Sequence, residues 1–253
     1  MKFERKRRGN SRYFIFMLMA IVVLVILIYT GRKILSKFDF LDTKTIAISG
    51  NLNLPEDFLR ELASGFYGRN IYSVSDDEIF AHYENIVRIK SIKVRRRLPH
   101  TICIKVEERR SHCLLKTTNG ILIPMDNEHV ILDNKGFYPF EDAPIISVNI
   151  DSGQLTTGSV FNDDETNHSL EMLSRIQEID ADFAQRISEF YHNNGQLHLV
   201  EVNSGSRILI GDGFLEEKLK RFAFFEQNQG LAQNSTVDLR FRNQIVCYTR
   251  SGK

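Results

Sequence analysis

The chain has 253 residues, with 33 basic and 32 acidic side chains and a formal net charge of +1. This length allows one or two domains with cores of their own. The balanced total excludes the strongly basic surface that is typical of nucleic-acid-binding proteins. Charge is instead concentrated locally, and its position along the chain is informative.

The N-terminus predicts a membrane anchor. Residues 1–12 form a basic tail with six Lys or Arg and one acid, and residues 13–30 carry no charge. As a helix, this apolar run is about 27 Å long, close to the hydrocarbon thickness of a bilayer. We therefore expect a transmembrane helix over residues 13–31 and a polar linker over 32–42. A cleaved signal peptide is the alternative, although no small-residue cleavage site follows the run.

More Lys and Arg precede this helix than follow it closely. The positive-inside rule then places the N-terminus in the cytoplasm and the bulk of the chain outside the membrane. This compartment also argues against nucleic acid as a partner.

Three cysteines, Cys103, Cys113 and Cys247, do not form a disulfide framework, because their number is odd and no C-x-x-C occurs. Cys103 and Cys247 lie in alternating apolar runs, where a thiol is most simply a small sheet or core residue. One disulfide among the three stays open, since the extracytoplasmic space can be oxidising.

The segment after the linker, residues 43–108, predicts a β-α-α-β-β unit. A strand ends at Gly50, and a first helix follows Pro55. Ser75 and Glu78 have the spacing of a capping box and predict the start of a second helix. Two alternating strands then flank a turn at residues 97–100, with one apolar and one charged face.

From residue 110 onward the sequence predicts an antiparallel β-rich domain with two helices. Asn119-Gly120 is a hairpin signal, and the turns at 194–195 and 204–205 predict a three-stranded meander. The helices are expected over 164–179 and from Gly211 to Gly230, the second capped by Asp212. One last strand is expected over 237–248. The predicted fold class is α+β: a transmembrane helix, the β-α-α-β-β unit and this domain.

Nothing in the sequence forms a catalytic or metal-binding constellation, and no cofactor site is expected. The His residues are scattered, and no pair has metal-ligand spacing. Asp126, Glu128 and His129 share one loop, which is a solvated turn or, less simply, a cation site.

Two features remain as candidate sites. A basic run contains Lys93, Arg95, Arg96 and Arg97, which is either a docking surface for an acidic partner or lipid headgroups, or the solvated face of a hairpin. The second feature is the terminal strand. A terminal strand often lies at a sheet edge, where its free N–H and C=O groups can pair with a strand of another chain. An ordinary closing strand is the alternative.

The combination resembles the FtsQ/DivIB family of bacterial cell-division proteins over nearly the whole chain. "IAISGN" (46–51), "GRNIYSVSDDEI" (68–79) and "VRIKSIKVRRRLPHTICIKVEER" (87–109) are similar to parts of its POTRA domain, and "VDLRF" (237–241) to its last sheet. The domains would be the tail 1–12, the anchor 13–31, the linker 32–42, a POTRA domain 43–109 and a β domain 110–253.

The resemblance implies a non-enzymatic divisome scaffold in the inner membrane at the septum. The family's β domain binds FtsB, and through it FtsL, by strand addition at its C-terminal edge, while its POTRA domain contacts other division proteins. Arg240 and Phe241 match an Arg-Tyr pair of the family, with Phe in place of Tyr, so that any hydrogen bond from the hydroxyl is lost. The partner-binding residues implied here are Leu239, Arg240, Phe241, Arg242, Asn243, Gln244, Ile245 and Val246.

Two other functions stay open at this point. One is an anchored extracytoplasmic enzyme acting on the cell wall, which requires an acid, His or Cys with a shifted pKa in a cleft. The other is a POTRA-bearing transport or assembly factor. The oligomeric state and the angle between the domains do not follow from the sequence.

Overall fold

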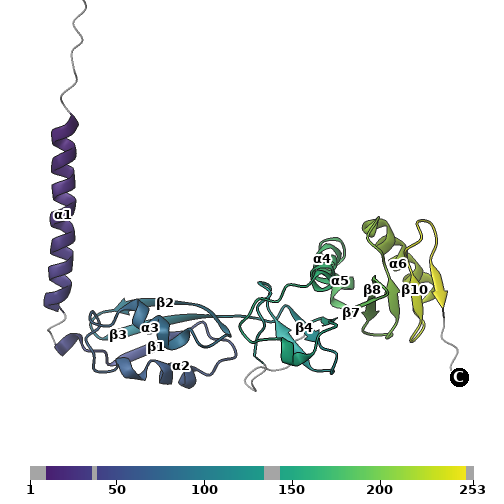
Figure 1. The fold of residues 1–253 in the computed structure, drawn as a ribbon, viewed down its shortest axis with the longest axis horizontal. Helices are drawn as coiled ribbons and strands as arrows, with labels where there is room; N and C mark the ends of the chain where they lie inside the picture. Colours follow the sequence, from purple (N-terminus) through teal and green to yellow (C-terminus); the bar gives the residue numbers. More distant parts are fainter. Residues whose placement is uncertain (1–9, 36–38, 134–142, 249–253) are drawn as a thin grey trace, which may run out of the picture. The chain divides into compact units, whose positions relative to one another are not determined.

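The computed structural model describes residues 10–35, 39–133 and 143–248 (Figure 1). The chain divides into two compact units, residues 1–108 and 109–253, which are described separately. Most of the predicted basic tail, residues 1–9, and part of the linker, residues 36–38, lie outside the described residues.

The N-terminal helix α1 runs from Asn10 to Leu35. Its described large apolar side chains are exposed, with exposed fractions between 49% for Ile21 and 80% for Tyr13. Counting only the residues that the structure describes, no helix has the length and apolar character needed to cross a membrane. The helix expected over residues 13–31 is thus present within α1, and its membrane-spanning role stays a prediction.

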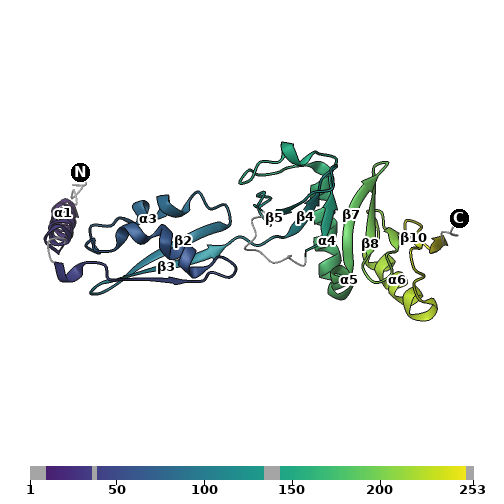
Figure 2. The same ribbon diagram turned by 90° about the horizontal axis from the view of Figure 1, so that it is seen from below.

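The rest of the first unit has the predicted β-α-α-β-β order (Figure 2). Its elements are the 3₁₀ turn η1 (Asp39–Leu41), β1 (Thr45–Ser49), α2 (Glu56–Leu62), η2 (Ser64–Phe66), α3 (Asp76–Tyr83), β2 (Ile89–Arg97) and β3 (Thr101–Glu108). β3 lies in the middle of the sheet, parallel to β1 and antiparallel to β2.

One face of this sheet is buried and the other is exposed. On β3, Ile102, Ile104 and Val106 are fully buried, as are Leu59 of α2 and Ile79 of α3. The residues that alternate with them are half-buried or exposed. The alternation seen in the sequence is therefore that of a sheet covered on one face.

The capping box at the start of α3 is only half formed. The Ser75 hydroxyl accepts a hydrogen bond from the Glu78 N–H at 3.1 Å, as predicted. The Glu78 carboxylate instead accepts from the Arg69 guanidinium at 3.0 Å. This arginine lowers the pKa of Glu78, and the reciprocal cap is replaced by an ion pair between the α3 N-terminus and the preceding loop.

Glu108 fixes the loop between β1 and α2. Its buried carboxylate accepts hydrogen bonds from the backbone N–H groups of Leu52 at 2.7 Å, Asn53 at 3.1 Å and Leu54 at 3.0 Å. A carboxylate that accepts several N–H groups holds a loop that has few backbone partners of its own. The last residue of β3 therefore ties the loop between β1 and α2 to the sheet of the first unit.

We expect Glu108→Gln to lower the free energy of unfolding of the first unit by about 1 kcal/mol, because charge-assisted hydrogen bonds become neutral ones. Urea unfolding of the full chain measures this. The exposed neighbour Glu107, changed to Gln, is the control and should alter stability by less than about 0.5 kcal/mol. Equal effects of the two substitutions would contradict this role.

The second unit contains one eight-stranded sheet with the order β11-β10-β9-β8-β7-β6-β4-β5. Its strands are β4 (Cys113–Lys116), β5 (Leu122–Met125), β6 (Ile145–Ser147), β7 (Ile187–Asn193), β8 (Gln196–Glu201), β9 (Arg207–Leu209), β10 (Thr236–Asp238) and β11 (Val246–Tyr248). Its helices are the 3₁₀ turn η3 (Ser152–Gln154), α4 (Asp164–Ile179), α5 (Ala181–Gln185) and α6 (Leu215–Gln229).

The hairpin at Asn119-Gly120, the β7-β8-β9 meander and the bounds of the helix at 164–179 are confirmed. The prediction of an antiparallel sheet with two helices was wrong. β4–β6, β6–β7 and β9–β10 are parallel pairs, and α5 is an additional short helix. Parallel neighbours need a crossover connection, which α4 and α5 provide between β6 and β7, and α6 provides between β9 and β10.

The three helices cover one face of the sheet, where the core of the second unit lies (Figures 1 and 2). Phe190, Leu199, Ile208 and Val237 lie in register on four neighbouring strands and belong to this core. α6 contributes Leu219 and Phe222, among others, to the same cluster.

Candidate functional site

The two edges of the large sheet differ in how they are covered. β5 contains Pro124, which has no N–H, and the Pro124 carbonyl accepts from the Leu132 N–H at 2.8 Å. Met125 bridges to Ile131, and the adjacent Val130 bridges to Val160. Segments of the same chain therefore already occupy the β5 edge.

β11 forms the opposite edge and has one strand neighbour among the described residues, β10. β10 itself lies between β9 and β11. The predicted single strand over 237–248 was therefore wrong: it is two three-residue strands joined by a loop, residues 239–245, which we call the β10–β11 loop. The edge position predicted for the terminal strand holds for β11 only.

Asp238 causes the break between the two strands. Its Oδ1 accepts a hydrogen bond from the Arg240 backbone N–H at 3.0 Å, two residues further along the chain. Asp side chains that bond their own backbone in this way mimic a backbone turn. The alternation of apolar and polar residues through 237–242 hid this turn in the sequence.

The Arg240 side chain completes the turn. Its Nε donates to Asp238 Oδ1 at 2.9 Å, its Nη2 to Asp238 Oδ2 at 2.5 Å, and its Nη1 to Gln196 Oε1 of β8 at 2.5 Å. Arg240 lowers the pKa of the Asp238 carboxyl, which is only 3% exposed, and Asp238 raises the pKa of Arg240. Arg240 is thus a positioning residue for the loop.

Two further contacts hold the β10–β11 loop, a third set lies in the neighbouring connection between β9 and α6, and none of them was expected. Arg221 of α6 donates to the Phe241 carbonyl at 3.3 Å, and the Arg242 guanidinium lies 4.7 Å from the centroid of the Phe214 ring. The buried Lys218 donates to the carbonyls of Ile210 at 2.6 Å and Gly211 at 3.2 Å.

Gly211 lies close to the side chains of both Arg240 and Lys218. Gly211 has φ +62, and a Cβ there would lie 3.2 Å from Arg240 Cγ and 3.4 Å from Lys218 Nζ. Burial lowers the pKa of Lys218. The sequence gives no signal that this lysine, the fourth residue of α6, is buried.

The predicted partner-binding residues therefore lie at different depths. Leu239 is buried and its N–H donates to the Leu209 carbonyl at 2.8 Å, so it belongs to the sheet. Ile245 and Val246 are half-buried. The exposed members of the set, all beside the β11 edge, are Arg240, Phe241, Arg242, Asn243 and Gln244.

Comparison with known proteins agrees with this two-unit architecture. Residues 41–109 match the model of the POTRA domain, FtsQ-type, and residues 117–240 match that of the cell division protein FtsQ/DivIB, C-terminal. The chain belongs to the FtsQ/DivIB family.

Relatives within this family are distant in sequence. The chain is 23% identical to the cell division protein DivIB of Clostridium botulinum strain Hall over 134 residues, which are 53% of this chain and 50% of that protein. Against DivIB of the Loch Maree strain, identity is 23% over 110 residues, 44% of this chain and 40% of that protein. The chain thus spans half or less of the length of these relatives.

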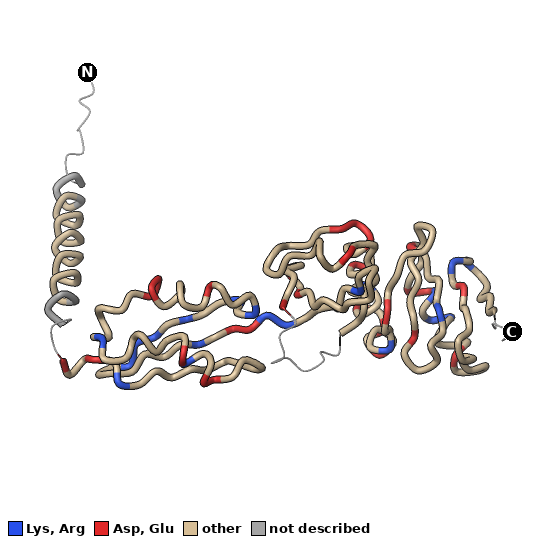
Figure 3. Tube along the Cα trace, turned by 60° about the horizontal axis from the view of Figure 1, so that its bottom comes forward, with Lys and Arg blue, Asp and Glu red and all other residues tan. Residues whose placement is uncertain are grey.

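In the POTRA domain of this FtsQ/DivIB chain, the predicted basic docking residues separate into two groups. Arg96 points to the helix side: its Nε donates to the Ile71 carbonyl at 2.8 Å, and its Nη2 donates to the Val74 carbonyl at 2.7 Å and pairs with Asp76 at 2.6 Å. Arg96 therefore holds the loop before α3, and its guanidinium is engaged within the domain. Lys93, Arg95 and Arg97 are exposed on the other face. Figure 3 shows Lys and Arg in blue along the strands of this domain.

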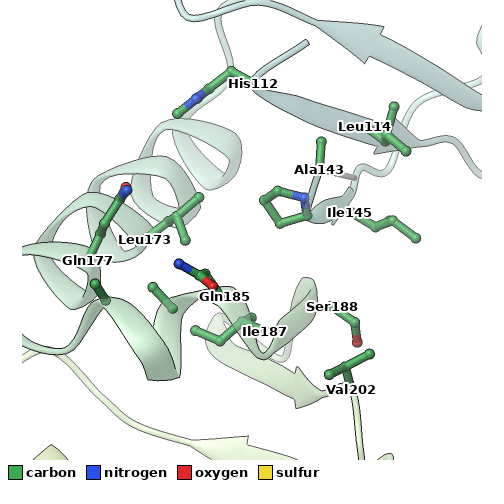
Figure 4. A pocket seen from close by; sticks show the side chains of 13 residues that line it. His112, Leu114, Ala143, Ile145, Leu173, Gln177, Gln185, Ile187, Ser188 and Val202 are labelled. Atoms are coloured by element: carbon green, nitrogen blue, oxygen red, sulfur yellow. The ribbon is translucent and has the colours of Figure 1, made fainter. Parts of the chain in front are cut away.

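A cleft of about 540 Å³ lies in the second unit, between α4 and α5 and the ends of β4, β6 and β7 (Figure 4). Its walls expose polar and apolar surface in similar amounts, and Leu114, Ile145, Leu173 and Ile187 are among its apolar side chains. His112 is its one titratable side chain among the described residues, and the remaining polar side chains are Gln177, Gln185 and Ser188. An acid–base pair of the kind a hydrolase uses is not assembled from these described residues.

Two clusters of acids and histidines have structural partners. Asp126 and Glu128 both pair with Arg109, at 2.5 and 2.7 Å, and Asp126 also accepts the N–H of Val130 at 2.8 Å. His168 lies 3.2 Å from His192 and 3.0 Å from Asp212, so Asp212 does not cap α6 as expected. Phe214 occupies that N-cap position, without a side-chain hydrogen bond.

The described residues contain neither a metal-binding cluster nor a disulfide. No group of three or more His, Cys, Asp or Glu there is arranged to hold a metal ion. The three cysteines are free: Cys103 is half-buried, Cys113 is buried and Cys247 is exposed on β11. Burial raises the pKa of Cys113 to about 12, which keeps this thiol protonated and unreactive at neutral pH.

Proposed function

We propose that this FtsQ/DivIB chain is a scaffold of the division machinery that recruits an FtsB/FtsL-type partner by strand addition to β11. The observation that carries the proposal is the asymmetry of the large sheet: its β5 edge is occupied by the chain itself, and within residues 10–35, 39–133 and 143–248 its β11 edge has one strand neighbour. A partner strand beside β11 gains backbone hydrogen bonds there, and the adjacent side chains select it.

The β10–β11 loop supports the selective part of this function. Asp238 and Arg240 fix its conformation before a partner arrives, which reduces the entropy lost on binding. Phe241 is 43% exposed, and Phe214, beneath Arg242, is 55% exposed. Exposed aromatic side chains beside an open strand edge are suited to anchoring the partner's apolar residues.

Membrane anchoring through α1 is part of the proposal. The uncharged run over residues 13–30 and the exposed apolar side chains of α1 support it, as does the basic tail that precedes them. Resistance of the full chain to extraction from membranes at alkaline pH is expected. Release of the chain under these conditions would contradict the anchor without touching the strand-addition claim.

A cell-wall enzyme and a POTRA-bearing transport factor are the alternatives from the sequence. The cleft beside α4 has one titratable side chain among its described residues, which gives the enzyme no support. The second unit matches a cell-division family, which favours the scaffold over a transport factor.

The direct test is the affinity of the full chain for the extracytoplasmic part of an FtsB-type protein, measured by calorimetry. We expect Phe241→Lys to weaken binding by about tenfold or more, because it replaces an apolar contact with a charge. Phe224→Lys is the matched control, since Phe224 is 70% exposed on α6 and lies outside the edge. Unchanged affinity of Phe241→Lys would remove the loop from the binding site.

A further inference from the structure

The exposed face of the POTRA sheet carries a basic surface made by two strands. Lys93, Arg95 and Arg97 lie on this face of β2, and Lys105 of β3 is directly opposite Lys93. We call these four residues the basic face. Like charges directly opposite each other destabilise a sheet. None of the four forms an ion pair with any described acid of the chain, and Glu107, on the same face, accepts from Ser91 at 2.8 Å.

The turn between β2 and β3 extends this surface with an apolar side chain. Leu98 follows Arg97 directly and is 59% exposed. Because strand residues rise by about 3.3 Å each, Arg97, Arg95 and Lys93 lie progressively further from this turn, in steps of about 7 Å. A leucine at the end of a row of basic side chains is the arrangement expected at a membrane interface, where apolar groups insert and cations meet phosphate.

The strand order brings this turn to the end of the domain where the chain arrives from α1. β1 is parallel to β3, with Thr45 paired to Thr101, so both strands start at the same end of the sheet. The backbone N–H of Lys44 donates to the His100 carbonyl at 2.9 Å, within the turn itself. Lys44 and Phe40 are exposed in the same connecting segment.

The connection also limits how far this end can lie from the membrane. Leu35 ends α1 and Lys44 is nine residues later, which span at most about 32 Å when fully extended. Two acids, Asp39 and Asp42, belong to this connection, and neither forms an ion pair with the basic face.

We propose that Leu98 and the adjacent basic face dock the POTRA domain onto a bilayer surface rich in anionic lipid. This inference rests on the proposed membrane anchor. Leu98 enters the interfacial region, Arg97 and Arg95 meet lipid phosphates, and Lys93 and Lys105 are further away. Docking restricts the orientation of the POTRA domain relative to the membrane.

The test uses tryptophan fluorescence, because the chain contains no Trp. Leu98→Trp places one fluorophore at the turn. Leu52→Trp is the matched control: Leu52 is 56% exposed, and its N–H binds Glu108, at the opposite end of the sheet. The full chain is reconstituted in nanodiscs of phosphatidylcholine with or without one third phosphatidylglycerol, including brominated lipid as quencher.

We expect a blue shift and quenching for Leu98→Trp in anionic nanodiscs only, and neither for Leu52→Trp. Adding Arg95→Glu and Arg97→Glu should reduce the ratio of docked to undocked domain by on the order of 25-fold or more, about fivefold for each lost cation. Lys93→Glu should have a smaller effect than Arg97→Glu. Salt at 0.5 M should weaken the docking, because it screens the attraction.

Identical emission of the two tryptophan variants in anionic nanodiscs overturns the proposal. A loss of division-protein recruitment on charge reversal, with unchanged emission from the turn, also overturns it and assigns the face to an acidic polypeptide. Extraction at alkaline pH reports separately on the anchor. If the chain is not anchored, the tryptophan emission of Leu98→Trp must still shift to the blue when phosphatidylglycerol vesicles are added at low salt. Unshifted emission in that experiment rejects the docking surface.

Discussion

Proline substitutions along β11 are expected to separate into two classes that alternate with position. Successive N–H groups of a strand point to opposite sides, so Val246 and Tyr248 share one direction and Cys247 has the other. Proline at an N–H that points away from β10 removes a donor needed by the partner strand and adds a clashing ring. Affinity for an FtsB-type partner should then fall on the order of 100-fold while the chain keeps its stability.

Proline in the other class breaks a hydrogen bond to β10. Both stability and partner affinity should then fall, because the edge itself is lost. Alanine at the same three positions is the control, since it removes side chains and keeps every backbone donor; its effect on affinity should be smaller. Calorimetry and urea unfolding of each variant provide the two measurements. Three prolines that all leave affinity unchanged would rule out strand addition at this edge.

The elements of the POTRA domain could be predicted because local signals there agree with the final packing. Alternating apolar residues on β3 face the helices, and Ser75 caps α3 as its spacing indicated. Arg96 shows the limit of such signals. It lies within a run of basic residues, and only the three-dimensional structure shows that it turns to the Ile71 and Val74 carbonyls while its neighbours face solvent.

The strand directions of the second unit were harder to predict, although the information was present. A helix between two strands favours a parallel crossover, and α6 connects β9 and β10 in this way. The hairpin signals at Asn119-Gly120 and Asn194-Gly195 indicate antiparallel pairs only, and they say nothing of the parallel pairs in the same sheet. Two strands of three residues each are also too short for alternation to show where one ends and the next begins.

The edge position of the last strand could be predicted from the sequence, but the construction of the loop before it could not, and partner binding there stays a prediction. The exposed loop residues lie beside an open edge, in the region implied by the resemblance to FtsQ/DivIB proteins. The sequence could not show that Lys218 is buried, because its contacts are to carbonyl groups, which every residue carries. The Asp238 turn has a sequence signal, an Asp two residues before an Arg, but the surrounding alternation outweighed it.

Asp238 is expected to couple the stability of the second unit to the binding edge. Asp238→Ala removes the hydrogen bonds from the Arg240 N–H, Nε and Nη2 to a buried carboxylate. We expect the loss of these bonds to lower the free energy of unfolding by about 2–3 kcal/mol. The loss is no larger because Arg240 is partly exposed, so its guanidinium recovers some hydration. Partner affinity should fall too, since the turn that leads to β11 is no longer fixed. Glu171→Ala, at an exposed position on α4, is the control for stability.

The pH dependence of stability distinguishes this role from simple packing. The folded-state pKa of Asp238 is lowered, so its contribution is fully present above the unfolded-state pKa, about 3.9, and is lost as pH falls through the folded value. The difference in unfolding free energy between wild type and Asp238→Asn should therefore be constant above about pH 5 and shrink on acidification below about pH 4. A difference that stays constant down to pH 2 would mean that the carboxylate charge does not hold the turn, and β11 would then owe its position to the contacts of Leu239 and Ile245 with the core.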